Sequence, residues 1–99
     1  RELNMYYSVL EVTPTDEAWI PRYVKLAADI VSKHGGKYLA NSANHQTLEG
    51  ERKEPAIRVI IQWPSKQHAL DFMSDPDYLP LLKLRTDGSV SHHALVEGK

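Results

Sequence analysis

One segment, residues 34–40 with the sequence His-Gly-Gly-Lys-Tyr-Leu-Ala, joins a helical pattern to an extended one and constrains the fold more than any other. Before it, apolar residues recur at the spacing of one helix face. They are Ile20, Tyr23, Val24, Ala27, Ile30 and Val31. Gly35 stands where a helix ends in a left-handed turn, which glycine adopts without steric cost. The pattern predicts a helix over residues 20–34, a tight turn, and a strand that begins at Lys37.

The rest of the chain predicts three further strands and a second helical region. Residues 3–12 and 57–63 read as strands with apolar side chains on both faces, and residues 90–97 read as the last strand. The second strand covers residues 37–40 and resumes over residues 46–49 after a bulge. Ser65 is a good N-cap for a short helix, and Asp75-Pro76 marks a fresh helix start that continues to about Thr86.

This order of elements predicts an α+β fold, the ferredoxin-like βαββαβ arrangement. With right-handed crossovers it gives a four-stranded antiparallel sheet with the helices on one face. Strands 3–12 and 57–63 would be central, so their second apolar face would be open to water. Large apolar patches mark interfaces. We therefore predict that residues 1–99 form one domain, and that it makes a homodimer by packing open sheet face on open sheet face, as a dimeric α/β barrel.

Charge and cysteine content exclude several classes of function. The formal net charge is −1 over 99 residues, so we expect no nucleic acid and no anionic membrane as partners. No apolar run approaches the roughly 20 residues of a membrane span, and no signal peptide is visible. The chain has no cysteine, which excludes thiolate chemistry and fits a cytoplasmic protein. No metal-ligand spacing is present, so we predict no metal and no cofactor.

The chain also resembles a known family over nearly its whole length. The residues that carry the resemblance are 34–40, Leu48-Glu49-Gly50, 58–65, Ala69, 72–78, Leu81, Leu84-Arg85 and Leu95-Val96-Glu97-Gly98. In this set and order the chain is similar to the domain of unknown function 1330 family, in the dimeric α/β-barrel superfamily. The resemblance implies a ferredoxin-like fold and a sheet-to-sheet dimer. Superfamily relatives include cofactor-free monooxygenases, isomerases and ligand-binding domains.

One segment departs from the pattern of that family. The family usually follows Leu-Ala with an arginine and two glycines, whereas this chain has Asn41-Ser42-Ala43. If that arginine serves an anionic ligand elsewhere in the family, this chain has lost the site or changed its specificity.

Two arginines are candidate site residues. Arg58 leaves its strand on the face opposite Val59 and Ile61, and an arginine in the barrel interior or the dimer interface needs an anionic partner. A structural ion pair with Glu11 or Glu49 is the favoured interpretation, and a ligand contact is the alternative. Arg85, at the end of the last helix, is interpreted as a solvated charge favoured by the helix dipole, with a ligand contact as the alternative.

Histidines and aromatic residues supply the other candidates. His92 and His93 leave opposite faces of one strand, so they do not chelate one metal, but one of them can act as an acid or base in a cavity. The catalytic candidates are His92 and Arg58. The aromatic side chains are interpreted as core and interface packing, or else as the wall of an apolar pocket for a small aromatic or acyl ligand. The ligand-binding candidates are His34, Tyr38, Asn41, Arg58, Trp63, Tyr78 and Arg85.

Three functions remain at this point. The first is a binding or structural module without catalysis, for which we expect a closed, well-packed barrel with no pocket of small-molecule size. The second is a cofactor-independent monooxygenase- or isomerase-like enzyme, which predicts a pocket that joins a histidine or tyrosine to Arg58. The third is a partner-regulated domain that uses the loop over residues 41–50.

Overall fold

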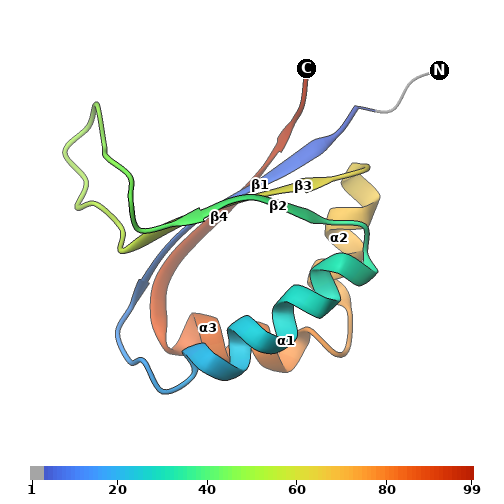
Figure 1. Ribbon diagram of the computed structural model, residues 1–99, viewed down its shortest axis with the longest axis horizontal. Helices are drawn as coiled ribbons and strands as arrows, with labels where there is room; N and C mark the ends of the chain where they lie inside the picture. Colours follow the sequence, from blue (N-terminus) through green and yellow to red (C-terminus); the bar gives the residue numbers. More distant parts are fainter. Residues whose placement is uncertain (1–3) are drawn as a thin grey trace.

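A four-stranded antiparallel sheet with three helices against one of its faces makes up residues 4–99, the part of the chain that the computed structural model describes (Figure 1). The elements follow in the order β1 (Tyr6–Pro14), α1 (Ile20–Lys33), β2 (Lys37–Ser42), β3 (Ile57–Trp63), α2 (Lys66–Ser74), α3 (Leu79–Asp87) and β4 (Ser89–Glu97). The strand order is β2-β3-β1-β4, so β1 and β3 are central. The predicted α+β, ferredoxin-like fold is confirmed. None of the helices in this part of the chain has the length and apolarity needed to cross a membrane.

The glycine pair after α1 has the predicted role. Gly35 has a φ of +77°, the left-handed conformation that ends the helix. Gly36 has a second constraint, because a Cβ atom there would lie 2.6 Å from Cγ1 of Val31 and 2.7 Å from Cζ3 of Trp63. The backbone between α1 and β2 therefore runs directly over the core, and only glycine leaves room for it.

The predicted strand over residues 46–49 is wrong. No strand is assigned there, and the chain between β2 and β3 forms a long loop that arches away from the sheet (Figure 1). Side chains take the hydrogen bonds that a strand would have made. The backbone N–H of Thr47 donates to Oε1 of Glu54 (2.5 Å), and the Thr47 hydroxyl accepts a hydrogen bond from Nη2 of Arg58 (2.9 Å). For the first strand, the predicted start at residue 3 lies outside the described residues.

The predicted helix start at Asp75-Pro76 is also wrong, because Asp75 stabilises a turn instead. Its Oδ1 accepts a hydrogen bond from the backbone N–H of Asp77 (2.8 Å), and its carbonyl accepts one from Tyr78 (2.8 Å). The next helix, α3, begins at Leu79 and carries a proline in its first turn, where the missing N–H costs nothing. The second helical region is thus divided into α2 and α3.

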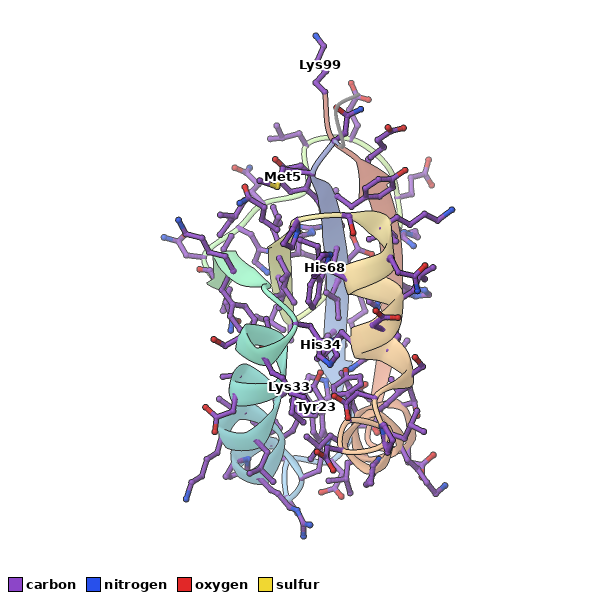
Figure 2. The ribbon with its side chains drawn as sticks, turned by 90° about the vertical axis from the view of Figure 1, so that its right-hand side faces the viewer. Met5, Tyr23, Lys33, His34, His68 and Lys99 are labelled. Carbon is purple, nitrogen blue, oxygen red and sulfur yellow. The ribbon has the colours of Figure 1, made fainter. Side chains whose placement is uncertain are left out.

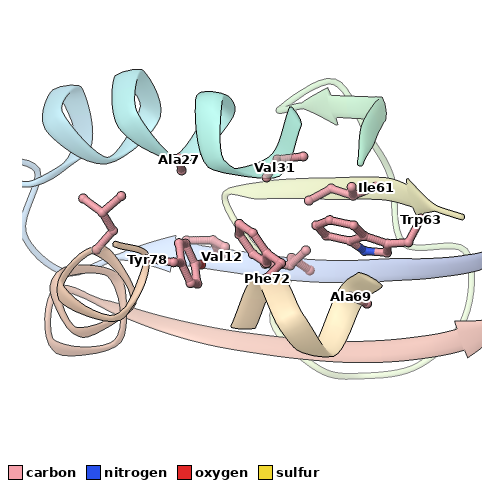
Figure 3. Close-up of a cluster of buried hydrophobic side chains, with 10 residues drawn as sticks. Val12, Ala27, Val31, Ile61, Trp63, Ala69, Phe72 and Tyr78 are labelled. Carbon is pink, nitrogen blue, oxygen red and sulfur yellow. The ribbon is translucent and has the colours of Figure 1, made fainter. Parts of the chain in front are cut away.

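The core lies between the sheet and the α2–α3 side of the helical layer. Phe72 lies between two other aromatic rings, with centroid distances of 5.0 Å to Trp63 and 4.1 Å to Tyr78 (Figure 3). Ala27 and Val31 of α1 complete this cluster and are almost fully buried. Helix α1 therefore packs tightly on the core through its C-terminal half, whereas the space between its N-terminal half and the sheet is less completely filled.

The other face of the sheet carries no helix in the described part of the chain (Figure 1). Alternation along the strands and the pairing register place a common set of apolar side chains on this open face. They are Tyr7, Val9, Ile60, Ala94 and Val96. The second apolar sheet face that the sequence predicts is therefore present.

Candidate functional site

A cavity of about 600 Å³ lies between the N-terminal half of α1 and the sheet. Its walls are mostly apolar and come from all layers of the fold. The lining residues are Leu10, Val12, Pro14, Trp19, Ile20, Tyr23, Val24, Ala28, Tyr38, Asn41, Ala43, Ala56, Ile57, Val59, Ile61 and Arg85. Small-molecule sites in proteins occupy about 300–1,000 Å³ and are largely apolar with a few polar groups. This cavity matches both descriptions.

The sequence explains why the space is there. Alternate residues of β1 and β3, such as Leu10 and Val59, point toward the helices. Opposite them, α1 presents Val24 and Ala28, whose side chains are too short to fill the gap. Farther along the helix, the larger aromatic side chains of the core occupy the same layer. The space opens to solvent beside Val24 and Tyr38, so it is an apolar cleft that a small molecule can enter.

Arg85 is the one charged side chain in the cavity wall, and it is only 3% exposed. The last turn of α3 faces the sheet, so the guanidinium points inward, where its Nη1 donates to Oγ of Ser91 (2.7 Å). Its Nε is buried and has no hydrogen-bond partner among residues 4–99. The interpretation of Arg85 as a solvated helix-end charge is therefore wrong.

Two tyrosine hydroxyls form a hydrogen-bonded pair beside the N-terminal half of α1. The hydroxyl of Tyr23, which lines the cavity, lies 2.7 Å from that of Tyr78. Figure 2 shows Tyr23 in the seam between α1 and the α2–α3 side of the helical layer. Burial, reinforced by the neighbouring Tyr78 hydroxyl, raises the pKa of Tyr23 well above its usual value. Tyr23 is therefore a neutral phenol at physiological pH, able to donate one hydrogen bond.

His93 is a second polar group beneath the helices. Its Nε2 lies 2.8 Å from Oγ of Ser8, which also accepts a hydrogen bond from the indole N–H of Trp63 (2.8 Å). Burial, with a smaller contribution from the positive charge of Arg85, lowers the pKa of His93 to about 4. The imidazole is therefore neutral at physiological pH, and Arg85 carries the positive charge in this part of the molecule.

Comparison with known proteins assigns the chain to a family. A model described as a domain of unknown function (DUF1330) matches residues 5–99. The chain belongs to the DUF1330 family. No curated protein matches it.

Solved structures similar to this DUF1330 domain share its fold at low sequence identity. A protein of unknown function from Rhodopseudomonas palustris, RPA0582, superposes with a TM-score of 0.82 at 15% identity, over 99% of this chain and 85% of that one. SnoaB, a cofactor-independent oxygenase from Streptomyces nogalater, gives a TM-score of 0.66 at 19% identity, over 97% and 94% of the two chains. A hypothetical protein from Arabidopsis thaliana gives a TM-score of 0.70 at 10% identity, over 99% of this chain and 90% of that one. These likenesses establish the ferredoxin-like fold.

The DUF1330 structure brings three of the predicted ligand-binding residues together. Tyr38, Asn41 and Arg85 all line the cavity. The segment that departs from the family pattern also contributes there, through Asn41 and Ala43. The departure therefore falls on the cavity wall, where a change of residue would alter which ligand fits.

Two other predicted ligand-binding residues lie in the core. Trp63 is fully buried beside Phe72. Tyr78 is 1% exposed and reaches the cavity only through its hydrogen bond to Tyr23.

The seventh ligand-binding candidate, His34, lies at the end of α1. Its Nε2 is 2.7 Å from Oδ2 of Asp75, which also accepts a hydrogen bond from Nζ of Lys33 (3.0 Å). Hydrogen bonds from His34 first, then from the backbone of Asp77 and from Lys33, hold the pKa of Asp75 far below its usual range. This cluster fastens α1 to the turn before α3, outside the cavity.

The catalytic candidates Arg58 and His92 lie on the open face of the sheet, away from the cavity. Arg58 contacts Oε2 of Glu11 through Nε (3.4 Å) and Nδ1 of His45 through Nη1 (3.0 Å). Glu11 is thus the partner in the predicted ion pair. His92 borders a second hollow of about 280 Å³ together with Glu11 and Arg52.

The cavity tests two of the functional hypotheses. A pocket of small-molecule size is present, contrary to the closed barrel expected for a module without catalysis. The enzyme hypothesis predicts a pocket joined to Arg58, and this is wrong because that side chain lies on the opposite face. The cavity joins a tyrosine to Arg85 instead.

Sequence reasoning missed Tyr23 as a site residue, because its spacing in α1 marks it only as a core-facing position. One signal was available: a tyrosine on a buried helix face needs a hydrogen-bond partner for its hydroxyl. Nothing in the sequence marks Ser8 as the partner of His93 or Ser91 as the partner of Arg85. Isolated serines are common in strands, and which side chains they contact depends on the fold.

Proposed function

We propose that this DUF1330 domain is a homodimeric, cytoplasmic protein that binds a small and largely apolar organic molecule in the cavity beneath α1. The observation that carries the proposal is the cavity itself, whose volume of about 600 Å³ is enclosed mainly by aliphatic and aromatic side chains. A few polar groups, those of Arg85, Tyr23 and Asn41, supply orientation. The absence of cysteine supports a reducing compartment.

A binding experiment with an uncharged probe tests this function. N-phenyl-1-naphthylamine brightens in apolar surroundings, and we expect saturable enhancement with the wild-type protein. Val59→Trp places an indole in the cavity and should weaken binding about tenfold or more, since pocket fit discriminates on this scale. Leu70→Trp, at an exposed position of α2 outside the cavity and away from the open sheet face, is the matched control and should bind as wild type. Equal binding by both variants, or none by the wild-type protein, would refute the proposal.

The homodimer is supported by the open sheet face. All three helices lie on one side of the sheet, so the sheet has one face without a covering layer in the described part of the chain (Figure 1). Stable interfaces bury about 800 Å² per partner, with an apolar centre. Ile60 lies on the central strand β3 on this face. We expect sedimentation to show a dimer for the wild-type protein and a monomer for Ile60→Lys; a wild-type monomer would contradict this part of the proposal.

A cofactor-independent oxygenase- or isomerase-like activity is the second candidate. The observation that favours it is the presence of a cation, Arg85, and a neutral phenol, Tyr23, at one cavity, because together they would stabilise an enolate. The two candidates differ in the fate of a bound aromatic ligand. Its absorbance spectrum stays constant over hours if the domain only binds, and changes with enzyme-dependent kinetics if it catalyses.

A further inference from the structure

We infer that the ligand of the cavity is a monoanion, an aryl or acyl carboxylate whose charge is neutralised by Arg85. This inference rests on the proposed binding function and specifies its ligand. The structural basis is a buried guanidinium without a counter-charge, in the wall of an apolar cavity of small-molecule size.

The charge around Arg85 is unbalanced. In residues 4–99, no carboxylate lies within 4 Å of its guanidinium nitrogens. The groups that surround it are hydroxyls: Ser91 accepts a hydrogen bond from Nη1, and the hydroxyls of Tyr23 and Tyr78 lie beside the guanidinium. An arginine does not lose its proton in a protein, and a desolvated charge without a partner is strongly unfavourable. A bound anion would remove this cost.

Other charges within the described residues show how unusual Arg85 is. The side chain of Asp75 is 4% exposed, and it pairs with both His34 and Lys33. Glu11 is partly buried and pairs with both Arg52 and Arg58. The fold therefore balances its shielded carboxylates with cations. Arg85 is more buried than any of these cations and has no such partner.

The hydrogen-bond inventory points to the same ligand. Nη1 is used by Ser91, but Nε is buried with its donor capacity unfilled. Buried donors without a partner are rare in native proteins and call for an explanation such as a missing ligand. A carboxylate is a suitable acceptor because its planar group matches the planar donor fork of arginine.

The rest of the wall limits the ligand to one negative charge on an apolar body. Among the cavity-lining residues, Arg85 is the only one that carries a charge. A phosphate or dicarboxylate would bring more charge than one guanidinium can balance. Leu10, Val12 and Ile57 offer aliphatic contact, and Trp19 and Tyr38 offer aromatic faces. An aryl or acyl monocarboxylate satisfies both requirements.

The test compares 2-naphthoate with 2-naphthamide, which have the same shape and differ in charge. Calorimetric titration of the wild-type protein should show 2-naphthoate binding at least about tenfold more tightly, the scale of a hydrogen bond to a charged group. Arg85→Met, which keeps side-chain length without charge, should bind the two compounds equally. Arg22→Met, at an exposed arginine of α1 outside the cavity, should keep the wild-type preference. The wild-type comparison alone decides the matter if Arg85→Met does not fold.

Failure of the inference and failure of the proposed function give different results. If the wild-type protein binds the amide as tightly as the carboxylate, or if Arg85→Met keeps the preference, the carboxylate inference is overturned and the binding function stands. If the wild-type protein binds neither compound and also fails to bind N-phenyl-1-naphthylamine, the binding function falls and the inference falls with it.

Discussion

Replacing Arg85 by methionine should cost the ligand-free protein almost no stability, whereas most substitutions of buried residues are destabilising. The guanidinium is 3% exposed, and the described residues provide no carboxylate within ion-pair distance. Replacing buried charged groups by apolar ones of similar volume is often neutral or stabilising by about 1–4 kcal/mol. Against this gain stands the lost hydrogen bond to Ser91, worth roughly 1.5–3 kcal/mol because its donor is charged. The two contributions nearly cancel, so the expected net change in the free energy of unfolding is within about 1 kcal/mol of zero.

Urea unfolding measures this difference, and it should be done at one fixed protein concentration, because the stability of the proposed dimer would depend on concentration. The midpoint for Arg85→Met should stay close to that of the wild-type protein, with an unchanged slope. A carboxylate ligand should then stabilise the wild-type protein more than the variant. A loss of about 3–5 kcal/mol in Arg85→Met would refute the reasoning, because a loss of that size is what breaking a buried ion pair produces.

Two further predictions concern the core. Because the pKa of His93 is lowered from 6.5 to about 4, the unfolded state binds the extra proton first, so the free energy of unfolding should fall as the pH drops from 6.5 to about 4, by up to about 3 kcal/mol. Urea titrations across this pH range should show that the free energy of unfolding depends less on pH in His93→Asn than in the wild-type protein. The same pH dependence in both proteins would contradict the lowered pKa of His93. Gly36→Ala should cost about 1–3 kcal/mol in thermal unfolding, because its methyl group would overlap Val31 and Trp63, and a wild-type midpoint would contradict that contact.

The sheet and its two faces could be predicted because the signals for them are local. Alternation over residues 57–63 fixes which side chains of β3 face the helices, and the spacing in α1 fixes the face that packs on the core. The glycine turn follows from the same segment, since a left-handed turn has a residue preference of its own. These patterns survive into the folded structure because no tertiary contact opposes them.

The cavity and its charge could not be predicted, because they depend on where separate elements meet. A cation in the last turn of a helix is equally consistent with solvent and with burial; the docking of α3 on β4 decides in favour of burial for Arg85. The same holds for Asp75, where a proline follows an aspartate in turns as well as at helix starts, and contacts from α1 select the turn. Loop residues 46–49 were mistaken for a strand because the competing side-chain partners, Glu54 and Arg58, come later in the chain.

The most direct test of the central claim is a crystal structure of the protein with 2-naphthoate. We predict the naphthalene ring in the cavity beneath α1, against Val59 and Tyr38, with its carboxylate within hydrogen-bond distance of the Arg85 guanidinium. A ligand bound instead on the open sheet face beside Arg58, or in the cavity with its carboxylate turned away from Arg85, would contradict the account.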